Sequence, residues 1–385
     1  MITKLKIFNF KSHIATELNM GFLTVLTGIN SSGKTSVIQS LLLLRQSEKK
    51  GRPGLDLNKP LCDIGKSKDA ISRFAVNDVI TFAIEFGEND KHVWNFDLDK
   101  SYNSTFIPLV TNAGNPLFGS ISSPLLENKN SLKQLHLFNN NFQYLSASRW
   151  ANRNSYPMDT YVVETEKQLS LEYGQGELVA HFLEYYGNHR SFDICLEKSL
   201  HPNCPSKKLL DQTIAWENEI SPRITMTVRK RADAEDVVVE YGYNARTNIR
   251  ELRAENVGFG ISYSLPVIIA LLSALPGGLV IIENPEAHLH PRGQSKLAEL
   301  IALTAQSGVQ IILETHSDHI FNGLRKCIAA KKIDTNNLKI HFFELNEDNV
   351  SVNTEIQFSE TGRVLNYKNG LFDQFDEDLD ILLGL

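Results

Sequence analysis

The stretch GINSSGKT, from Gly28 to Thr35, decides the fold. It fits the pattern GxxxxGK[ST], and it lies between a strand-like run at 23–27 and a helical apolar run at 34–46. Glycines let the backbone curl so that amide N–H groups point inward at phosphate oxygens, and the start of the following helix adds partial positive charge. The stretch therefore predicts a phosphate-binding loop between a strand and a helix.

Two side chains of this loop have specific expected roles. Lys34 is expected to reach the β- and γ-phosphates of ATP, and the Thr35 hydroxyl is expected to ligate Mg²⁺. The competing interpretation is a glycine-rich turn with a surface lysine. The expected ATP-binding residues are Asn30, Ser31, Ser32, Gly33, Lys34, Thr35 and Ser36.

Two apolar runs further along the chain end in polar residues. LVIIENPE (279–286) is typical of a buried strand of a parallel sheet, and Glu283 follows it at the edge where open α/β sheets bind ligands. Glu283 is therefore a candidate Mg²⁺ ligand, directly or through water. IILETHS (311–317) has the same form, and its His316 could hydrogen-bond a γ-phosphate or the attacking water. Taken alone, each is more often a helix cap or a loop residue.

Composition narrows the class of protein. The chain has 385 residues and a net charge of −6, with 42% hydrophobic and 22% charged residues. These values are ordinary for globular proteins. They exclude a disordered tail protein, a collagen-like fibre, a disulfide-rich module and a generally basic nucleic-acid coat, but not a local basic patch.

The cysteines and the apolar stretches indicate the cellular compartment of the protein. The four cysteines are scattered, without a CxxC pair or zinc spacing, which favours a reducing compartment. The first residues lack the apolar core of a signal peptide, and the longest apolar stretch, 265–275, is too short to span a bilayer. We expect a soluble cytoplasmic protein with no membrane contact.

Several motifs together resemble a known family. The phosphate loop, ENPEAHLHPRGQ (283–294) and ETHSDH (314–319) resemble ABC-class ATPases of the SMC, RecF and OLD type. The resemblance is closest to bacterial AAA-type ATPases with the LHP motif, which are often encoded in phage-defence operons. The stretch 362–374 is similar to the short tail domain of one such branch, and the middle is similar only weakly, at YLSASR (144–149).

The resemblance implies an α/β P-loop NTPase fold: an ABC-ATPase-like head with a mixed sheet, a β-rich lobe and a helical insertion. It also implies a homodimer in which two heads enclose two ATP molecules with Mg²⁺, each phosphate loop facing a signature loop of the partner. The usual signature, LSGGQ, is absent. Gly258, Gly260 and Ser262 in VGFGIS stand in its place and could offer N–H groups and a hydroxyl to the γ-phosphate. The alternative is a plain loop with a helix cap.

Two departures from the family limit the inference. The family's acidic pair, in which the second residue polarises the attacking water, is Glu283-Asn284 here. Asn284 can orient water but cannot accept its proton, so hydrolysis is expected to be slow or to be served by Glu286 or His316. A glutamine for the Q-loop is also not identified, because Gln39 and Gln46 fall on the first expected helix.

The expected division of the chain follows from these motifs. We expect strands at 79–86 and 92–98, 135–145, 223–229 and 236–243, with a mainly helical region at 155–220 that includes a helix at 175–187. The expected parts are an N-terminal head segment (1–54), a β-rich lobe (55–150), a helical insertion (151–222), a C-terminal head segment (223–345) and a tail domain (346–385).

The tail and the basic clusters are weaker signals. The 69 residues after His316 are too few for a Toprim nuclease, so the acidic run 376–380 is expected to be a solvated helix face. His288 and His290 are expected to be structural rather than metal ligands. Two basic clusters could contact nucleic-acid phosphates or be plain solvated loops. They are Lys49, Lys50 and Arg52, and Arg229, Lys230 and Arg231.

Arg149 and Arg153 are expected on a functional surface rather than in the core. The leading hypothesis for the whole chain is an ATP-dependent dimerisation switch that controls a separately encoded effector, such as a nuclease, in antiphage defence. One alternative is a repair or recombination ATPase that clamps DNA like RecF. Another, prompted by Asn284, is a pseudoenzyme that binds ATP as a scaffold.

Overall fold

The computed structural model describes residues 1–51, 53–87, 90–98, 102–110, 132–188, 192–243, 251–253 and 256–383. The chain divides into two compact units. Unit 1 comprises Met1–Asn58, Cys62–Lys129 and Glu314–Leu385, and unit 2 comprises Lys59–Leu61 and Asn130–Leu313. Among the described residues, no helix has both the length and the apolar character needed to cross a membrane.

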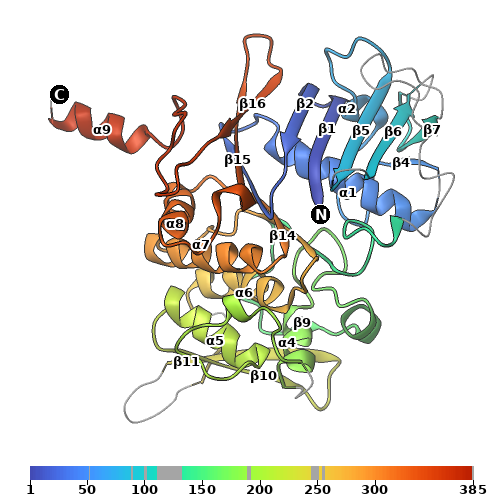
Figure 1. Ribbon diagram of the computed structural model, residues 1–385. Coiled ribbons are helices and arrows are strands. Elements are labelled where there is room, and N and C mark those ends of the chain that lie inside the picture. Colours follow the sequence, from blue (N-terminus) through green and yellow to red (C-terminus); the bar gives the residue numbers. More distant parts are fainter. Residues whose placement is uncertain are drawn as a thin grey trace. The chain divides into compact units, whose positions relative to one another are not determined.

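An antiparallel sheet forms one part of unit 1 (Figure 1). Apolar residues of its first strand alternate with more exposed ones, which gives the strand one buried face. The hairpin expected at 79–86 and 92–98 is present, with its second strand at 90–97; Glu88 and Asn89 lie outside the described residues. In sheet order the strands are β2 (His13–Asn19), β1 (Ile2–Phe10), β5 (Val79–Phe86), β6 (Asp90–Asp97), β7 (Phe106–Val110) and β4 (Gly54–Asp56).

The second part of unit 1 joins the beginning of the chain to its end. Strand β3 (Leu23–Gly28) pairs in parallel with β15 (Leu338–Leu345), which pairs antiparallel with β16 (Ser351–Ile356). A Cβ on Gly28 would lie 2.1 Å from the Phe343 carbonyl oxygen, so only glycine allows this approach at the end of β3. The described helices of the unit are α1 (Lys34–Lys50), α2 (Ser67–Ala70), α8 (Asp318–Ala329) and α9 (Gln374–Leu383), with a 3₁₀ turn at Thr335–Asn337.

Unit 2 contains a parallel set of strands and a small antiparallel sheet. Strands β14 (Gln310–Glu314), β13 (Leu279–Glu283) and β8 (Phe142–Leu145) lie in that order, and every residue of β13 and β14 is buried. The last residue of β14, Glu314, belongs to unit 1. The small sheet has β10 (Ile224–Lys230), β11 (Asp236–Tyr243) and β12 (Glu251–Arg253), with β9 (Tyr156–Pro157) paired to β11.

Four α-helices are described in unit 2: α4 (Val179–Asn188), α5 (Leu209–Ile220), α6 (Phe259–Ser273) and α7 (Pro291–Gln306). A π-helical turn at Tyr161–Thr165 and a 3₁₀ turn at Glu197–Ser199 accompany them. The twelve buried residues of α6 make it the central helix of this unit. The strands expected at 223–229 and 236–243 are confirmed as β10 and β11.

Two expectations from the sequence are wrong in detail. A strand at 135–145 is limited to Phe142–Leu145, because Asn139 and its neighbours form turns in which the Asn139 side chain accepts from the Asn141 amide. The helix expected from residue 175 begins only at Val179, because Gly174 and Gly176 adopt left-handed φ angles of 64° and 71°. Most of 155–178 is therefore irregular rather than helical.

Candidate functional site

The phosphate loop of unit 1 connects β3 to α1, as the sequence predicts. Gly33 caps α1 with a left-handed φ of 98°. A Cβ at this position would lie 2.4 Å from the Ser351 Oγ and 2.8 Å from both the Ser12 Oγ and the His13 Nε2. Only glycine therefore fits, because β16 and the turn between β1 and β2 pack directly on the loop.

Side-chain hydrogen bonds hold the loop in this shape. The His13 ring contacts the Gly33 carbonyl at 3.0 Å, and the Ser351 hydroxyl donates to the Ser32 carbonyl at 2.7 Å. The Ser32 hydroxyl donates to the Ile29 carbonyl at 2.7 Å. Burial lowers the pKa of His13 to about 4, so its ring is neutral at pH 7.

Lys34 folds back into the loop. Its Nζ donates to the carbonyls of Gly28 at 3.0 Å and Ile29 at 2.6 Å. Burial lowers the pKa of Lys34, and the nearby Glu314 carboxylate opposes that shift. The ammonium group is thus inside the curl of the loop, where the motif predicts a phosphate-binding cation.

The Thr35 hydroxyl donates to the Glu314 carboxylate at 2.8 Å. Glu314 ends β14, is only 5% exposed, and is followed by Thr315, whose amide donates to the Leu26 carbonyl at 3.1 Å. Burial lowers the pKa of His316, and the positive charge of Lys34 lowers it further. Unit 1 therefore gathers an ammonium, a hydroxyl, a carboxylate and a neutral imidazole around the loop.

Glu314 was not among the expected site residues, although a signal for it exists. It ends an apolar strand in the same way as Glu283 does. Of the other expected ATP-binding residues, Asn30, Ser31 and Thr35 are exposed, and Ser32 and Ser36 are buried.

A cavity of about 480 Å³ opens beside Ser31. Its size is within the range of ligand pockets. Lys11 reaches it from the turn after β1 with its Nζ held by the Gln39 Oε1 at 2.6 Å, and Phe74 is 48% exposed there. No sequence motif predicts this cavity. Its lining residues are Lys11, Ser12, Ser31, Lys68, Asp69, Ile71, Arg73, Phe74, Leu345 and Asn349.

In unit 2, Glu283 is held at the end of β13 by a segment far away in sequence. The Tyr144 hydroxyl donates to its Oε1 at 2.9 Å, and the Ala147 amide contacts its Oε2 at 3.1 Å. Burial raises the pKa of Glu283, although both hydrogen bonds favour the charged form. The weakly recognised YLSASR stretch thus provides the support for this carboxylate.

Arg149 is buried, so its expected place on a functional surface is wrong. The guanidinium donates to the carbonyls of Ser146 and Glu283 at 2.6 Å and of Asn284 at 2.9 Å. It also lies 4.1 Å from the centre of the Tyr263 ring. These main-chain and aromatic contacts offset the cost of burial, which lowers the pKa of Arg149.

Arg153, by contrast, is exposed and stacks on Trp150 at 4.8 Å, as expected of a surface residue.

The turn after β13 is unusual in its backbone. Asn284 has a left-handed φ of 43°, a conformation that asparagine tolerates better than glutamate. Within the described part of the chain its Oδ1 is buried without a hydrogen-bond partner. Glu286 is 9% exposed. His290 caps α7 by accepting from the Arg292 amide at 3.3 Å.

The signature-like loop packs against the same turn. A Cβ on Gly260 would lie 2.5 Å from the His288 carbonyl oxygen, and the Phe259 and His288 rings are 4.5 Å apart. Ser262 is 1% exposed, and its hydroxyl accepts from the Asn152 amide at 2.9 Å. Gly258 and Phe259 are exposed. Within this chain the Ser262 hydroxyl is therefore already engaged, and only the loop's first residues lie at the surface.

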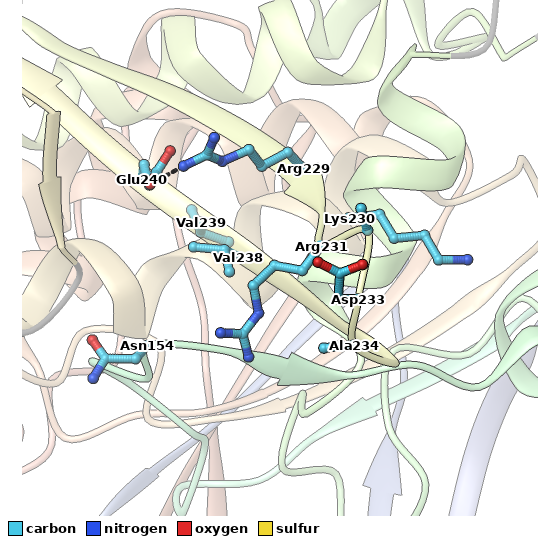
Figure 2. Close-up of a pocket in the computed structure, with 10 residues that line it drawn as sticks. Asn154, Arg229, Lys230, Arg231, Asp233, Ala234, Val238, Val239 and Glu240 are labelled. Carbon is cyan, nitrogen blue, oxygen red and sulfur yellow. Dashed lines mark hydrogen bonds and ion pairs between the residues drawn. The ribbon is translucent and has the colours of Figure 1, made fainter.

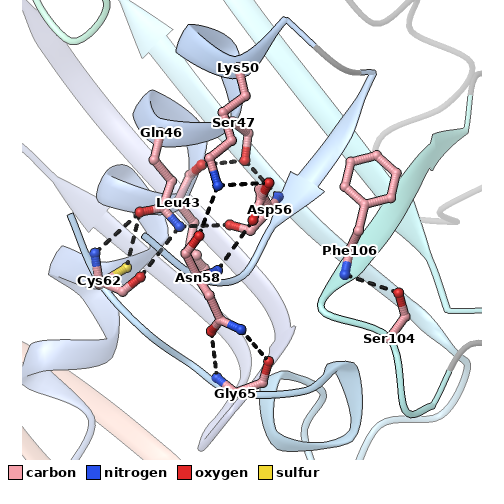
Figure 3. A network of polar contacts seen from close by, with 10 residues as sticks. All are labelled: Leu43, Gln46, Ser47, Lys50, Asp56, Asn58, Cys62, Gly65, Ser104 and Phe106. Carbon is pink, nitrogen blue, oxygen red and sulfur yellow. Dashed lines mark hydrogen bonds and ion pairs between the residues drawn. The ribbon is translucent and has the colours of Figure 1, made fainter. Parts of the chain in front are cut away.

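Gln46 takes part in a polar network at the end of α1 (Figure 3). Its Nε2 donates to the Asp56 carbonyl at 2.7 Å, and its Oε1 accepts from the Cys62 amide at 3.2 Å. Lys50 pairs with the Asp56 carboxylate at 2.9 Å and donates to the Asn58 carbonyl at 2.9 Å. Lys50 thus stabilises this fold locally. Arg52, which the sequence placed in the same basic cluster, lies outside the described residues.

The second basic cluster lines an open cavity of about 950 Å³ at the β10–β11 hairpin (Figure 2). Arg229 pairs with Glu240 at 2.5 Å, and Arg231 pairs with Asp236. Figure 2 shows the Lys230 side chain extending away from Arg229. Two of the three positive charges are thus balanced within the hairpin itself.

Comparisons with known proteins bear on the whole chain. Residues 1–173 match the family described as "AAA ATPase domain". Residues 180–322 match "AAA domain, putative AbiEii toxin, Type IV TA system", and residues 333–382 match "Protein of unknown function (DUF3696)". No curated protein matches the chain.

Two solved structures of similar fold are SMC heads. An Smc head from Pyrococcus furiosus, with an extended coiled coil and bound to the C-terminal domain of ScpA, has a TM-score of 0.50 and 13% identity, covering 100% of this chain and 98% of that one. A second SmcHead is bound to the C-winged helix domain of ScpA. It has a TM-score of 0.51 and 14% identity, and the match covers 93% of this chain and 98% of that one. The mixed α/β fold is therefore confirmed as similar to that of SMC heads, and residues 1–173 and 180–322 match models of AAA-type ATPase domains.

Proposed function

We propose that this chain is an ATP-dependent dimerisation switch that controls a separately encoded effector, such as a nuclease, in bacterial antiphage defence. The observation that carries the proposal is the phosphate loop of unit 1. Its Lys34 ammonium lies inside the curl, Thr35 is exposed at the start of α1, and a cavity of about 480 Å³ opens beside Ser31. The AbiEii and Type IV toxin–antitoxin description of one matching family is compatible with a defence role.

The residues around Thr35 fit Mg²⁺, the ion that accompanies ATP in such sites. Hydroxyl and carboxylate oxygens are the donors it prefers, and the Thr35 Oγ1 and a Glu314 oxygen lie 2.8 Å apart. Thr35 would hold the ion, with Glu283 as the second expected ligand. When bound, Mg²⁺ neutralises charge on the β- and γ-phosphates.

The protein groups themselves divide the remaining tasks. Lys34 binds and neutralises phosphate oxygens, and Tyr144 and the Ala147 amide keep Glu283 in place. Asn284 can orient a water molecule but cannot take its proton. The neutral imidazole of His316 or the Glu286 carboxylate would accept that proton. We infer slow turnover because neither residue stands directly after Glu283, where the family has its catalytic acid.

For the ATP sandwich, α6 supplies the surface that would face a partner's nucleotide. Gly258 and Phe259 are exposed at the start of this 15-residue helix, whose first N–H groups favour an anion. The Ser262 hydroxyl is held by Asn152. We therefore infer that main-chain amides, rather than a signature serine, would contact the γ-phosphate. The similar heads bound to ScpA domains illustrate that a head of this fold can carry a partner chain.

A second candidate is a DNA-clamping ATPase, and the cavity lined by Arg229, Lys230 and Arg231 favours it. The internal pairing of Arg229 and Arg231 weakens that interpretation. A third, an ATP-binding pseudoenzyme, is favoured by Asn284 alone. Salt-sensitive DNA binding that ATP stimulates would support the clamp. Repeated phosphate release that depends on Lys34 would exclude the pseudoenzyme.

The central test compares wild type with Lys34→Ala in ATP and Mg²⁺. We expect ATP to dimerise wild type and Lys34→Ala to lose ATP binding and slow phosphate release by about 100-fold or more. Light scattering after size exclusion, equilibrium nucleotide binding and multiple-turnover phosphate release measure these effects. Lys230→Ala is the matched control, since it also removes one lysine charge but lies on β10, outside the phosphate-loop motif. A Lys34→Ala protein that still closes with ATP would refute the switch.

A further inference from the structure

Helix α9 exposes an apolar stripe. Leu379, Leu382 and Leu383 follow the i, i+3, i+4 spacing that places side chains on one face of a helix. They are 40%, 82% and 64% exposed. In Figure 1 the helix extends away from α8 and from β15. Exposed apolar stripes of this kind mark interaction sites.

Acidic residues lie beside this stripe. Asp378 and Asp380 are exposed on α9, as the expected solvated helix face predicts; the side chains of residues 374–377 lie outside the described part of the structure. The helix therefore combines an apolar stripe with a negatively charged border. The partner that it fits has an apolar floor and a positively charged rim.

The same unit contains a pocket of that chemistry, which we name the α8–tail pocket. Its volume is about 280 Å³. Phe321 of α8 and Phe372 of the tail form its aromatic floor, with ring centres 5.0 Å apart. Its lining residues are Phe321, Asn322, Arg325, Arg363, Val364, Tyr367, Leu371 and Phe372.

Two arginines give this pocket its positive rim. Arg325 is fixed, because its Nε donates to the Gly362 carbonyl at 2.9 Å and its Nη1 donates to the Asn322 Oδ1 at 2.8 Å. Arg363, which follows Gly362 on the tail, also lines the pocket and is exposed. A carboxylate from a helix lying in the pocket can pair with these guanidinium groups, and leucines can cover the aromatic floor.

The chain's own α9 does not cover this pocket. The helix begins at Gln374, only two residues after Phe372, which itself lines the pocket, and its leucines are exposed. Little chain is available between Phe372 and Gln374 for the helix to turn back over Phe372. A second copy has no such constraint.

We propose that two copies of this chain exchange α9, so that the helix of each copy docks in the α8–tail pocket of the other. Such a reciprocal contact closes with twofold symmetry and buries both apolar stripes. It uses none of the nucleotide-site residues, so it goes beyond the ATP sandwich and forms without ATP.

The test begins with sedimentation velocity of the full chain without nucleotide, over a range of concentrations. We expect a monomer–dimer equilibrium, whose dissociation constant rises by about tenfold or more in Leu382→Asp. Ile381→Asp is the matched control, since Ile381 is 77% exposed but faces another side of the helix, and it should leave the equilibrium unchanged. A monomeric wild type, or equal effects of the two substitutions, would overturn the proposal.

Charge exchange identifies the docking site. Asp380→Arg and Arg363→Asp should each weaken the dimer, whereas an equimolar mixture of the two variants should restore it, because each contact then pairs opposite charges. A mixture that stays monomeric would overturn the assignment of this pocket. Lys34→Ala separates this contact from the nucleotide switch, since it should keep the ATP-independent dimer even if it loses every response to ATP.

Discussion

The phosphate loop of unit 1 and the Glu283 turn of unit 2 are positioned in different ways. The loop is recognisable from its own residues, because glycines at 28 and 33 and the Lys34 hydrogen bonds to main-chain carbonyls lie within the motif. His13 and Ser351 add support from outside it. The Glu283 turn is held by side chains from elsewhere, with Arg149 lying 134 residues from the carbonyl it contacts. A local motif can thus be recognised in a sequence, whereas its distant supports are found only in the folded chain.

The largest expected effect is on the Glu283 turn. Arg149→Met removes the donor to three main-chain carbonyls, two of them in buried hydrogen bonds, and the partner of the Tyr263 ring. We expect the free energy of unfolding to fall by about 3–5 kcal/mol. Urea unfolding measures this, and the exposed Arg153→Met, expected to cost less than about 1 kcal/mol, is the control. Equal losses in the two variants would contradict the proposed support.

The two units should also respond to pH in opposite directions. In unit 2, Glu217 is buried against the Ser264 hydroxyl, and burial raises its pKa to about 8 from 4.5. Because the folded state then holds a proton that the unfolded state releases, stability is present below pH 4.5 and falls by about 1.4 kcal/mol per pH unit up to about pH 8. Urea unfolding of wild type and Glu217→Gln should show this slope only in wild type.

In unit 1, burial lowers the pKa of His13 to about 4 from 6.5. The stability it contributes is fully present above pH 6.5 and is lost as the pH falls toward 4. Hydrogen exchange should show α1 and the loop loosening on acidification, and His13→Gln should remove this trend. Parallel trends in the two units would contradict the comparison.

A smaller effect is expected from Gly33→Ala, which tests the backbone origin of the loop. The added methyl group meets Ser12, His13 and Ser351 at a φ of 98°, so we expect a loss of about 1–3 kcal/mol and weaker nucleotide binding. Gly258→Ala is the control for stability, because its φ is −56° and its Cβ would meet no atom within 4 Å. Thermal unfolding measures both variants, and ATP titration compares Gly33→Ala with wild type. An unaffected Gly33→Ala protein would show that the loop is less constrained than its contacts indicate.

The smallest effect is expected from Tyr144→Phe. It removes one hydrogen bond to the Glu283 Oε1 and keeps the ring, so the cost should be about 1 kcal/mol. The pKa of Glu283 should rise further, since a hydrogen bond to its charged form is lost. Unfolding experiments and the pH dependence of phosphate release measure these two changes.

The sequence predicts those structural features that are determined by residues close together in the chain. The phosphate loop, the strands that end in Glu283 and Glu314, and the hairpins follow from short patterns. The role of Arg149 cannot be predicted from a short pattern. Its burial depends on carbonyls of another segment, and the stretch YLSASR does not show which carbonyls the guanidinium will contact. The prediction of a strand at 135–145 is wrong in its first half, and the sequence contains the reason. The run of asparagines at 139–141 is typical of a turn.

The pairing of β3 with β15 has a consequence for synthesis. The ribosome makes Phe343 315 residues after Gly28, yet the two lie side by side. At typical elongation rates the interval between them is roughly 15 to 60 s. During that time β3 lacks its parallel neighbour and the loop lacks Ser351, so the nascent chain cannot form the complete phosphate site. ATP would therefore meet a finished binding site only once almost the whole head has left the ribosome.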